Sequence, residues 1–96
     1  MSHTVLANFK CNEGMGALLL PVLLEALADT RAFEGCESIE TYVDQDNPDL
    51  ILLWEKWDKR ESHAAYIEWR IESGMLDDLA PILEIPLNFN HLSPQD

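Results

Sequence analysis

The alternation of apolar and polar residues predicts four β-strands. Near-alternating spacing over Thr4–Cys11 (TVLANFKC) is typical of a strand half-buried on a sheet. The segment 36–44 (CESIETYVD) alternates as well, with one face formed by Ile39, Thr41 and Val43. A third segment, Leu50–Trp57 (LILLWEKW), is apolar on both faces until Glu55, which predicts a central strand buried on both sides. The last strand is expected over 87–92 (LNFNHL), with Leu87, Phe89 and His91 on one face.

Two long segments between these strands have helical character. The first, MGALLLPVLLEALADTR, is rich in Leu and Ala, and Pro21 is expected in the first turn because proline cannot donate its backbone N–H. A second helix is predicted from a capping box at Asp58–Glu61 to about Ser73. Its end is marked by Gly74, which favours the left-handed conformation, and a shorter helix over 75–83 should be interrupted at Pro81.

The order of these elements is strand, helix, strand, strand, helix, strand, with one short extra helix before the last strand. This is the ferredoxin-like βαββαβ order of an α+β protein, in which helices cover one face of an antiparallel sheet. The 96 residues suffice for one domain, residues 1–96. On the third strand, Leu50, Leu52 and Trp54 point away from the set that contains Glu55. One apolar face is therefore left uncovered, which predicts a homodimer.

Composition and charge exclude several classes of partner. The formal net charge of −12 disfavours nucleic acid and anionic membranes, and no apolar stretch approaches the roughly twenty residues of a membrane span. No secretory signal is apparent, so a cytoplasmic location with free thiols at Cys11 and Cys36 is expected. The spacing of the three histidines gives no metal signature, and no glycine-rich phosphate loop is present.

Several short motifs, in this order and spacing, resemble the antibiotic biosynthesis monooxygenase domain. They are Gly35-Cys36, Asp46-Asn47-Pro48, Trp54-Glu55-Lys56-Trp57 and Ala64-Ala65-Tyr66, and the likeness covers nearly the whole chain. The resemblance implies a ferredoxin-like protomer in a dimeric α+β barrel, with a pocket in each protomer between sheet and helices. This expectation agrees with the uncovered sheet face.

The resemblance also implies candidate chemistry. Characterised members oxidise polycyclic phenols or quinols with molecular oxygen and without metal or flavin, and a subgroup degrades haem. The tryptophan that the cofactor-free oxygenases place at the end of the third strand matches Trp57, and His63 stands where they have a polar helix residue. Their asparagine, however, is Leu53 here. The haem-degrading pattern is not matched, because its three key residues correspond most closely to Ala7, Tyr66 and Leu76. No cofactor is therefore expected.

The residue types suggest roles for a site on the second helix. His63 is a candidate base, because imidazole titrates near neutrality, with a solvated helix histidine as the alternative. Tyr66 and Arg70 lie four residues apart on one helix face and are candidates for stabilising an anionic substrate oxygen, or else form a surface pair. The candidate substrate-binding residues are Trp57, Leu53 and Trp69, although aromatic residues at such spacing are commonly core.

Two hypotheses follow. The first is a cofactor-independent monooxygenase acting on a phenolic or quinol-type aromatic substrate with molecular oxygen. The second is a non-catalytic dimeric domain that binds a small ligand or a partner protein on the same scaffold, since one fold hosts many functions. Oxygen consumption separates the two hypotheses.

Overall fold

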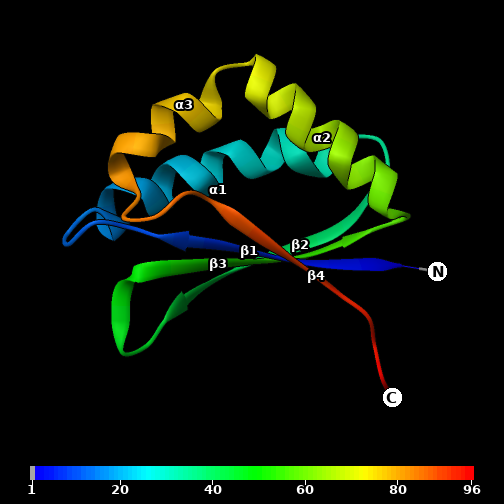
Figure 1. Cartoon of the computed structure of the whole chain (residues 1–96), viewed down its shortest axis with the longest axis horizontal. Helices are drawn as coiled ribbons and strands as arrows, with labels where there is room; N and C mark the ends of the chain where they lie inside the picture. The colour runs from blue at the N-terminus through cyan, green and yellow to red at the C-terminus, as the bar shows by residue number, and fades with distance from the viewer. Residues whose placement is uncertain (1) are drawn as a thin grey trace.

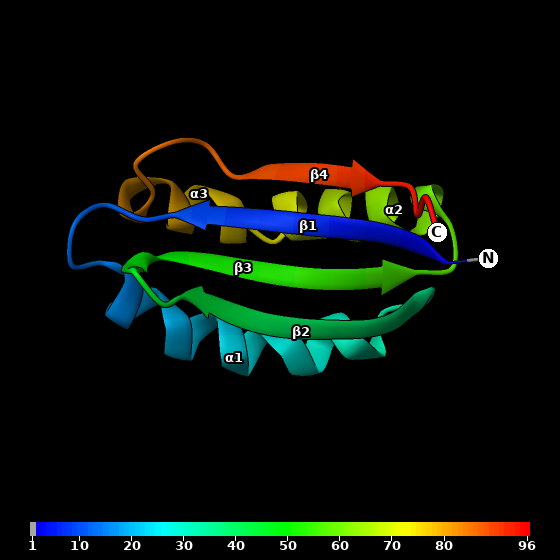
Figure 2. The same cartoon turned by 90° about the horizontal axis from the view of Figure 1, so that it is seen from below.

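A four-stranded antiparallel sheet with helices on one face forms the architecture of the computed structural model, which describes residues 2–96 (Figure 1). The elements in chain order are β1 (His3–Lys10), α1 (Gly16–Ala32), β2 (Cys36–Asp44), β3 (Asn47–Trp57), α2 (Arg60–Glu72), α3 (Met75–Leu79), a 3₁₀ turn (Ala80–Ile82) and β4 (Asn88–Leu92). The strand order β2-β3-β1-β4 places β1 and β3 at the centre of the sheet (Figure 2). The predicted ferredoxin-like α+β fold is confirmed.

The two faces of the sheet differ in burial as the alternation predicts. On β3 the buried positions are Ile51, Leu53, Glu55 and Trp57, and on β1 they are Val5, Ala7 and Phe9. The register pairs Val5 with Glu55 and with His91, so these three residues share the helix-covered face. The opposite face of β3 carries Leu50, Leu52 and Trp54, and the side chain of Trp54 is 36% exposed. Within residues 2–96 nothing covers the outer face of β3, so the expected burial on both faces is seen only for the inner face.

Helix α1 begins earlier than predicted. It starts at Gly16, so Pro21 lies in its second turn and not in its first. The carboxylate of Asp49 accepts the backbone N–H groups of Gly14 and Gly16 at 3.0 Å each, which satisfies donors that a helix start leaves free. Gly16 also packs so closely on the carbonyl of Pro48 that a β-carbon would overlap it. Contacts from a distant strand therefore fix this helix start, and local sequence does not show them.

The ends of α2 agree only partly with the sequence. The predicted capping box at Asp58 is wrong, because the helix begins at Arg60 after Lys59 and has no side-chain cap. The Asp58 carboxylate instead accepts the hydroxyl of Ser62 at 2.5 Å. At the other end Gly74 adopts a φ of +84°, the left-handed conformation predicted for it. Pro81 lies in the 3₁₀ turn that follows α3, as the interrupted helix implied.

Two groups of buried residues form the core. The larger group lies between α1, α3 and the inner face of the sheet, and the smaller one joins Val5, Trp57 and Tyr66 near α2. Cys11 and Cys36 are free thiols, as expected. In the part of the chain that the structure describes, no helix is long and apolar enough to cross a membrane.

Candidate functional site

A small, mostly apolar cavity lies between the inner face of the sheet and the helices. Its volume is about 40 Å³, which leaves room for water-sized molecules but not for an aromatic ring. The apolar wall comes from five elements and includes Phe9, Leu23, Leu53, Met75, Leu79 and Phe89. The polar side chains that border it are Thr30 of α1, Glu55 of β3, and Tyr66 and Arg70 of α2. A few polar groups in an apolar cavity are the usual composition of a ligand site.

Glu55 is a buried carboxyl that borders this cavity. Only 2% of its surface is exposed, because the alternation along β3 directs it to the inner face. The indole N–H of Trp57 donates a hydrogen bond to Glu55 Oε1 at 2.9 Å. Burial raises the pKa of the Glu55 carboxyl to about 7, and the hydrogen bond from Trp57 opposes this shift. Glu55 can therefore exchange a proton near neutral pH.

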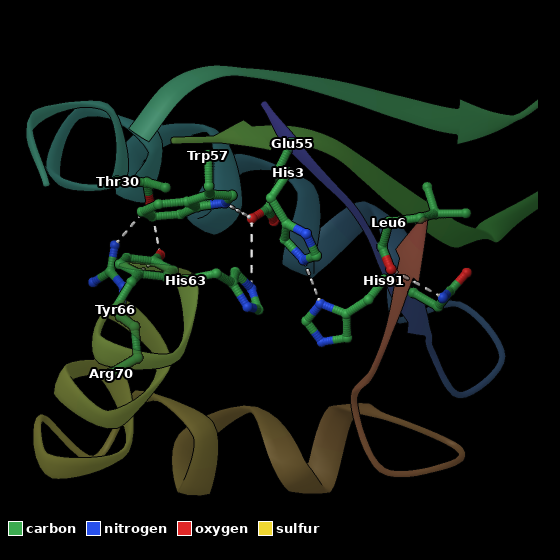
Figure 3. A network of polar contacts seen from close by, with 10 residues as sticks. His3, Leu6, Thr30, Glu55, Trp57, His63, Tyr66, Arg70 and His91 are labelled. Carbon is green, nitrogen blue, oxygen red and sulfur yellow. Dashed lines mark hydrogen bonds and ion pairs between the residues drawn. The ribbon is translucent and has the colours of Figure 1, made fainter. Parts of the chain in front are cut away.

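Arg70 and Tyr66 form a second polar group on the opposite wall. Arg70 Nε donates to the Tyr66 hydroxyl at 2.8 Å, and the same hydroxyl lies 2.7 Å from Thr30 Oγ1. One terminal nitrogen of Arg70 also donates to the Ala26 carbonyl at 3.0 Å. The same nitrogen donates to Thr30 at 3.2 Å (Figure 3). Over residues 2–96 no carboxylate lies within ion-pair distance of this guanidinium. A buried cation with neutral partners favours an anionic group in the cavity.

The side chain of His63 contacts Glu55 but does not border the cavity. Its Nε2 is 3.8 Å from Glu55 Oε1 and makes no hydrogen bond within the described chain. Burial, together with the neighbouring His91, His3 and Arg60, lowers the pKa of His63 to about 4. Between about pH 4 and pH 7 both shifts favour the uncharged forms, so over this range the contact joins a carboxylic acid to a neutral imidazole and is not an ion pair.

The structure brings together only some of the residues proposed from the sequence. Leu53, Tyr66 and Arg70 border the cavity. Trp57 has no exposed surface and contacts Glu55 without lining the cavity. Trp69 is 39% exposed, and its ring lies 4.6 Å from the Arg70 guanidinium carbon on the helix surface. The alternatives of a solvated His63 and of a surface Tyr66–Arg70 pair are wrong, since all three side chains are buried.

Glu55 is the residue that sequence reasoning missed as a candidate. The signal was present, because the alternation placed it with Ile51, Leu53 and Trp57 on one strand face. A carboxylate in an otherwise apolar inward set either is paired or shifts its pKa. In addition, no three side chains of His, Cys, Asp or Glu among residues 2–96 are placed to hold a metal ion together.

Comparison with known proteins defines the class of this chain. The family model of the antibiotic biosynthesis monooxygenases matches residues 2–70. The chain therefore belongs to the antibiotic biosynthesis monooxygenase family, as the sequence motifs suggested. No protein with curated annotation matches its sequence.

Solved structures show the same fold at low sequence identity. A conserved protein from Methanosarcina mazei Go1 superposes with a TM-score of 0.84 at 17% identity, over 99% of this chain and 94% of the other. A structure described as an antibiotic biosynthesis monooxygenase gives 0.84 at 17% identity, with 100% of both chains covered. Rv0793 from Mycobacterium tuberculosis gives 0.73 at 24% identity, over 100% of this chain and 97% of the other. These likenesses establish the fold, while function must be argued from the site.

Proposed function

We propose that this protein is a cofactor-independent monooxygenase that oxidises a phenolic or quinol-type substrate with molecular oxygen. The observation that carries the proposal is the pairing of two buried groups on one cavity. Glu55 is a carboxyl with a pKa raised to about 7, and Arg70 is a cation that has no carboxylate partner among residues 2–96. Such a pair suits the removal of a proton from a neutral ligand and the stabilisation of the anion that results.

The chemistry assigns a separate step to each group. Glu55 in its carboxylate form accepts the proton, a role first considered for His63, which does not border the cavity. Arg70 and the Tyr66 hydroxyl that it contacts stabilise the anion. For a carbon flanked by phenolic rings, CH₂ and O₂ then give a carbonyl and water, and the substrate supplies the electrons. Leu53 forms part of the apolar wall against which the ring packs.

The cavity must open for a substrate to enter. At about 40 Å³ it admits dioxygen beside Glu55 but not a ring. The side most suited to opening is α3, a five-residue helix whose Met75 and Leu76 border the cavity and are only partly buried. Unbranched methionine adapts its shape readily, so displacement of this edge enlarges the site at modest energetic cost.

A second candidate function is a non-catalytic domain that binds a small apolar molecule. The apolar lining of the cavity favours this candidate, as does Leu53 at the position where the family resemblance implies an amide in the cofactor-free oxygenases. A leucine cannot donate a hydrogen bond to a developing oxyanion. The scaffold would then hold its ligand without turnover.

One experiment separates the two candidates. Dissolved oxygen is followed with metal-free protein and a panel of hydroquinones and anthrone-like phenols, while tryptophan fluorescence reports binding. Oxygen uptake proportional to protein concentration supports the monooxygenase. Quenching of tryptophan emission without uptake supports the binding domain, and neither signal with folded protein contradicts both.

We also propose a homodimer formed through the outer face of the sheet. This face carries Tyr42, Leu50, Leu52 and Trp54 on β2 and β3, and β1 adds Leu6. Figure 2 shows the same face without a covering helix. Apolar strand faces of this kind are normally buried, and a second copy of the sheet matches its shape and polarity.

A further inference from the structure

A second hollow lies on the outer side of the Glu55–His63 contact. It opens between α2 and β4, has a volume of about 360 Å³, and is bordered by Arg60, His63, Glu68 and His91. Two side chains, Ile67 and Phe89, border both this hollow and the inner cavity and so form the wall between them. His63 stands in this wall, with Glu55 on the cavity side and His91 on the outer side.

Four titratable side chains lie near one another between the cavity and the surface. His63 Nε2 lies 3.8 Å from Glu55 Oε1, and its ring centroid is 5.5 Å from that of His91. His91 Nδ1 in turn lies 2.8 Å from Nε2 of His3 at the start of β1. Figure 3 draws the Trp57–Glu55, Glu55–His63 and His3–His91 contacts as dashed lines, with His3 and His91 on the side of Glu55 away from Trp57. Val5 pairs with both Glu55 and His91 across the sheet, so the register of β1 places these two residues on the same face.

We propose that His63 is a proton relay that connects Glu55 in the cavity to His91, His3 and solvent in the outer hollow. This inference rests on the proposed function for its purpose, since it identifies where a proton taken from the substrate goes. His63 is then a positioning and transfer residue that acts through Glu55, and it does not touch the substrate. The unpaired, buried Nε2 of His63 directed at Glu55 is the feature that a purely structural histidine would not need.

Each proton that Glu55 takes from the ligand is matched by a proton released in the outer hollow. Glu55 carboxylate takes a proton from the ligand and becomes the acid. It passes that proton to His63 Nε2, and the imidazolium loses a proton from Nδ1 to His91 or to water in the outer hollow. His63 returns to its neutral form with the tautomer changed, and rotation or reverse exchange with solvent restores it. No oxidant or reductant takes part in these steps.

The groups around His63 keep its imidazole uncharged when no proton is being transferred. Arg60 on α2 and the neighbouring His91 and His3 disfavour a positive His63, and burial acts in the same direction. Glu68 is the acidic group that borders the outer hollow, where a departing proton emerges. The imidazolium therefore exists only in passing, which suits a relay better than a store of protons.

Hydrogen exchange at the Trp57 indole tests the relay without any turnover. This N–H has no exposed surface and donates to Glu55, so exchange in the folded state needs a proton path that reaches Glu55. Its exchange in deuterated water is measured by NMR and corrected for intrinsic rate. The slowest backbone amides of β1 give the limit set by global unfolding. We expect indole exchange faster than this limit in the wild type.

The variants separate transfer from packing. His63→Leu fills the wall without a titratable group and should reduce indole exchange to the unfolding limit, and His91→Phe should slow it less. Phe89→Leu disturbs the same wall without removing a titratable group and is the control, with each rate corrected for measured stability. The relay is contradicted if wild-type exchange already equals the limit, or if Phe89→Leu slows exchange as much as His63→Leu.

Turnover adds an independent readout. In His63→Ala, kcat for oxygen uptake should fall on the order of a hundredfold with KM unchanged, and added imidazole should restore it through the outer hollow. Glu55→Gln should not respond to imidazole. If imidazole restores oxygen uptake in neither variant, the relay is contradicted. If the wild type consumes no oxygen, the proposed function fails, and indole exchange alone decides on the relay.

Discussion

The Trp57 indole donates its N–H to the carboxyl of Glu55, two residues earlier on the same strand, at 2.9 Å. Residues two apart share a strand face, so both side chains point beneath the helices. Trp57 is the residue that matches the strand-end tryptophan implied by the family resemblance, yet it does not border the cavity. In this chain its contact is with Glu55, which does.

Trp57→Phe should raise the pKa of Glu55 further above its present value near 7. The substitution keeps an aromatic ring in the core and removes the Trp57 hydrogen bond, which favours the carboxylate over the acid. Carboxyl ¹³C chemical shifts of Glu55, titrated from pH 5 to 9, measure the change. An unchanged or lower midpoint would show that the indole does not control this proton.

Stability should depend on pH in opposite directions for the two buried groups. The pKa of Glu55 rises on folding from 4.5 to about 7, so its contribution to the free energy of unfolding falls as pH rises through that interval. The pKa of His63 falls from 6.5 to about 4, so its contribution is lost as pH drops through that interval. Each change is on the order of 3 kcal/mol, and in the wild type the two slopes largely cancel.

Single substitutions should therefore reveal how each group makes the free energy of unfolding depend on pH. Urea unfolding of His63→Leu should show stability falling between about pH 4.5 and 7, whereas Glu55→Gln should show stability rising between about pH 4 and 6.5. Both curves are compared with the flatter wild-type curve. Parallel pH dependence in the two variants would contradict the neutral-pair description.

Arg70→Met should reduce oxygen uptake by roughly two orders of magnitude, because it removes the cation proposed to stabilise the substrate anion. Stability should fall by about 1–3 kcal/mol as the hydroxyls of Tyr66 and Thr30 lose their donor. Arg31→Met is the matched control, since Arg31, in the last turn of α1, donates to the Ile39 carbonyl and does not border the cavity. Equal loss in both variants would contradict a specific role for Arg70.

Trp54→Glu should convert the proposed dimer to a monomer. A carboxylate on the outer sheet face would be buried against the second copy without a partner. Trp69→Glu is the matched control, because Trp69 has a similar exposed fraction, 39% against 36%, but lies on α2. Sedimentation velocity gives the oligomeric state, and a monomeric wild type, or dissociation by both variants, would contradict this interface.

Most of the fold could be predicted from the alternation of apolar and polar residues. Strand pairing, the helix-covered face and the uncovered face follow from it, because a single buried face fixes strand register. The start of α1 did not follow, since it depends on the Asp49 carboxylate, 33 residues from Gly16. The absence of a cap at Asp58 likewise reflects a competing bond to Ser62.

The site was harder to predict than the fold. Helical spacing correctly grouped Tyr66 with Arg70, because residues four apart are neighbours on a helix. Which side of the wall His63 occupies depends on the packing of α2 against β4, and no local pattern encodes it. The pKa of Glu55 depends on how completely the helices close over β3, which is a property of the whole fold.

The role of Glu55 is tested most directly by oxygen uptake with Glu55→Gln, measured against an anthrone-like phenol with metal-free protein. The amide can still accept the Trp57 hydrogen bond but cannot take a proton. Glu61→Gln, an exposed acidic residue of α2, is the control. The account predicts a fall in kcat of about a hundredfold or more for Glu55→Gln and none for the control. Unchanged uptake by Glu55→Gln would contradict it.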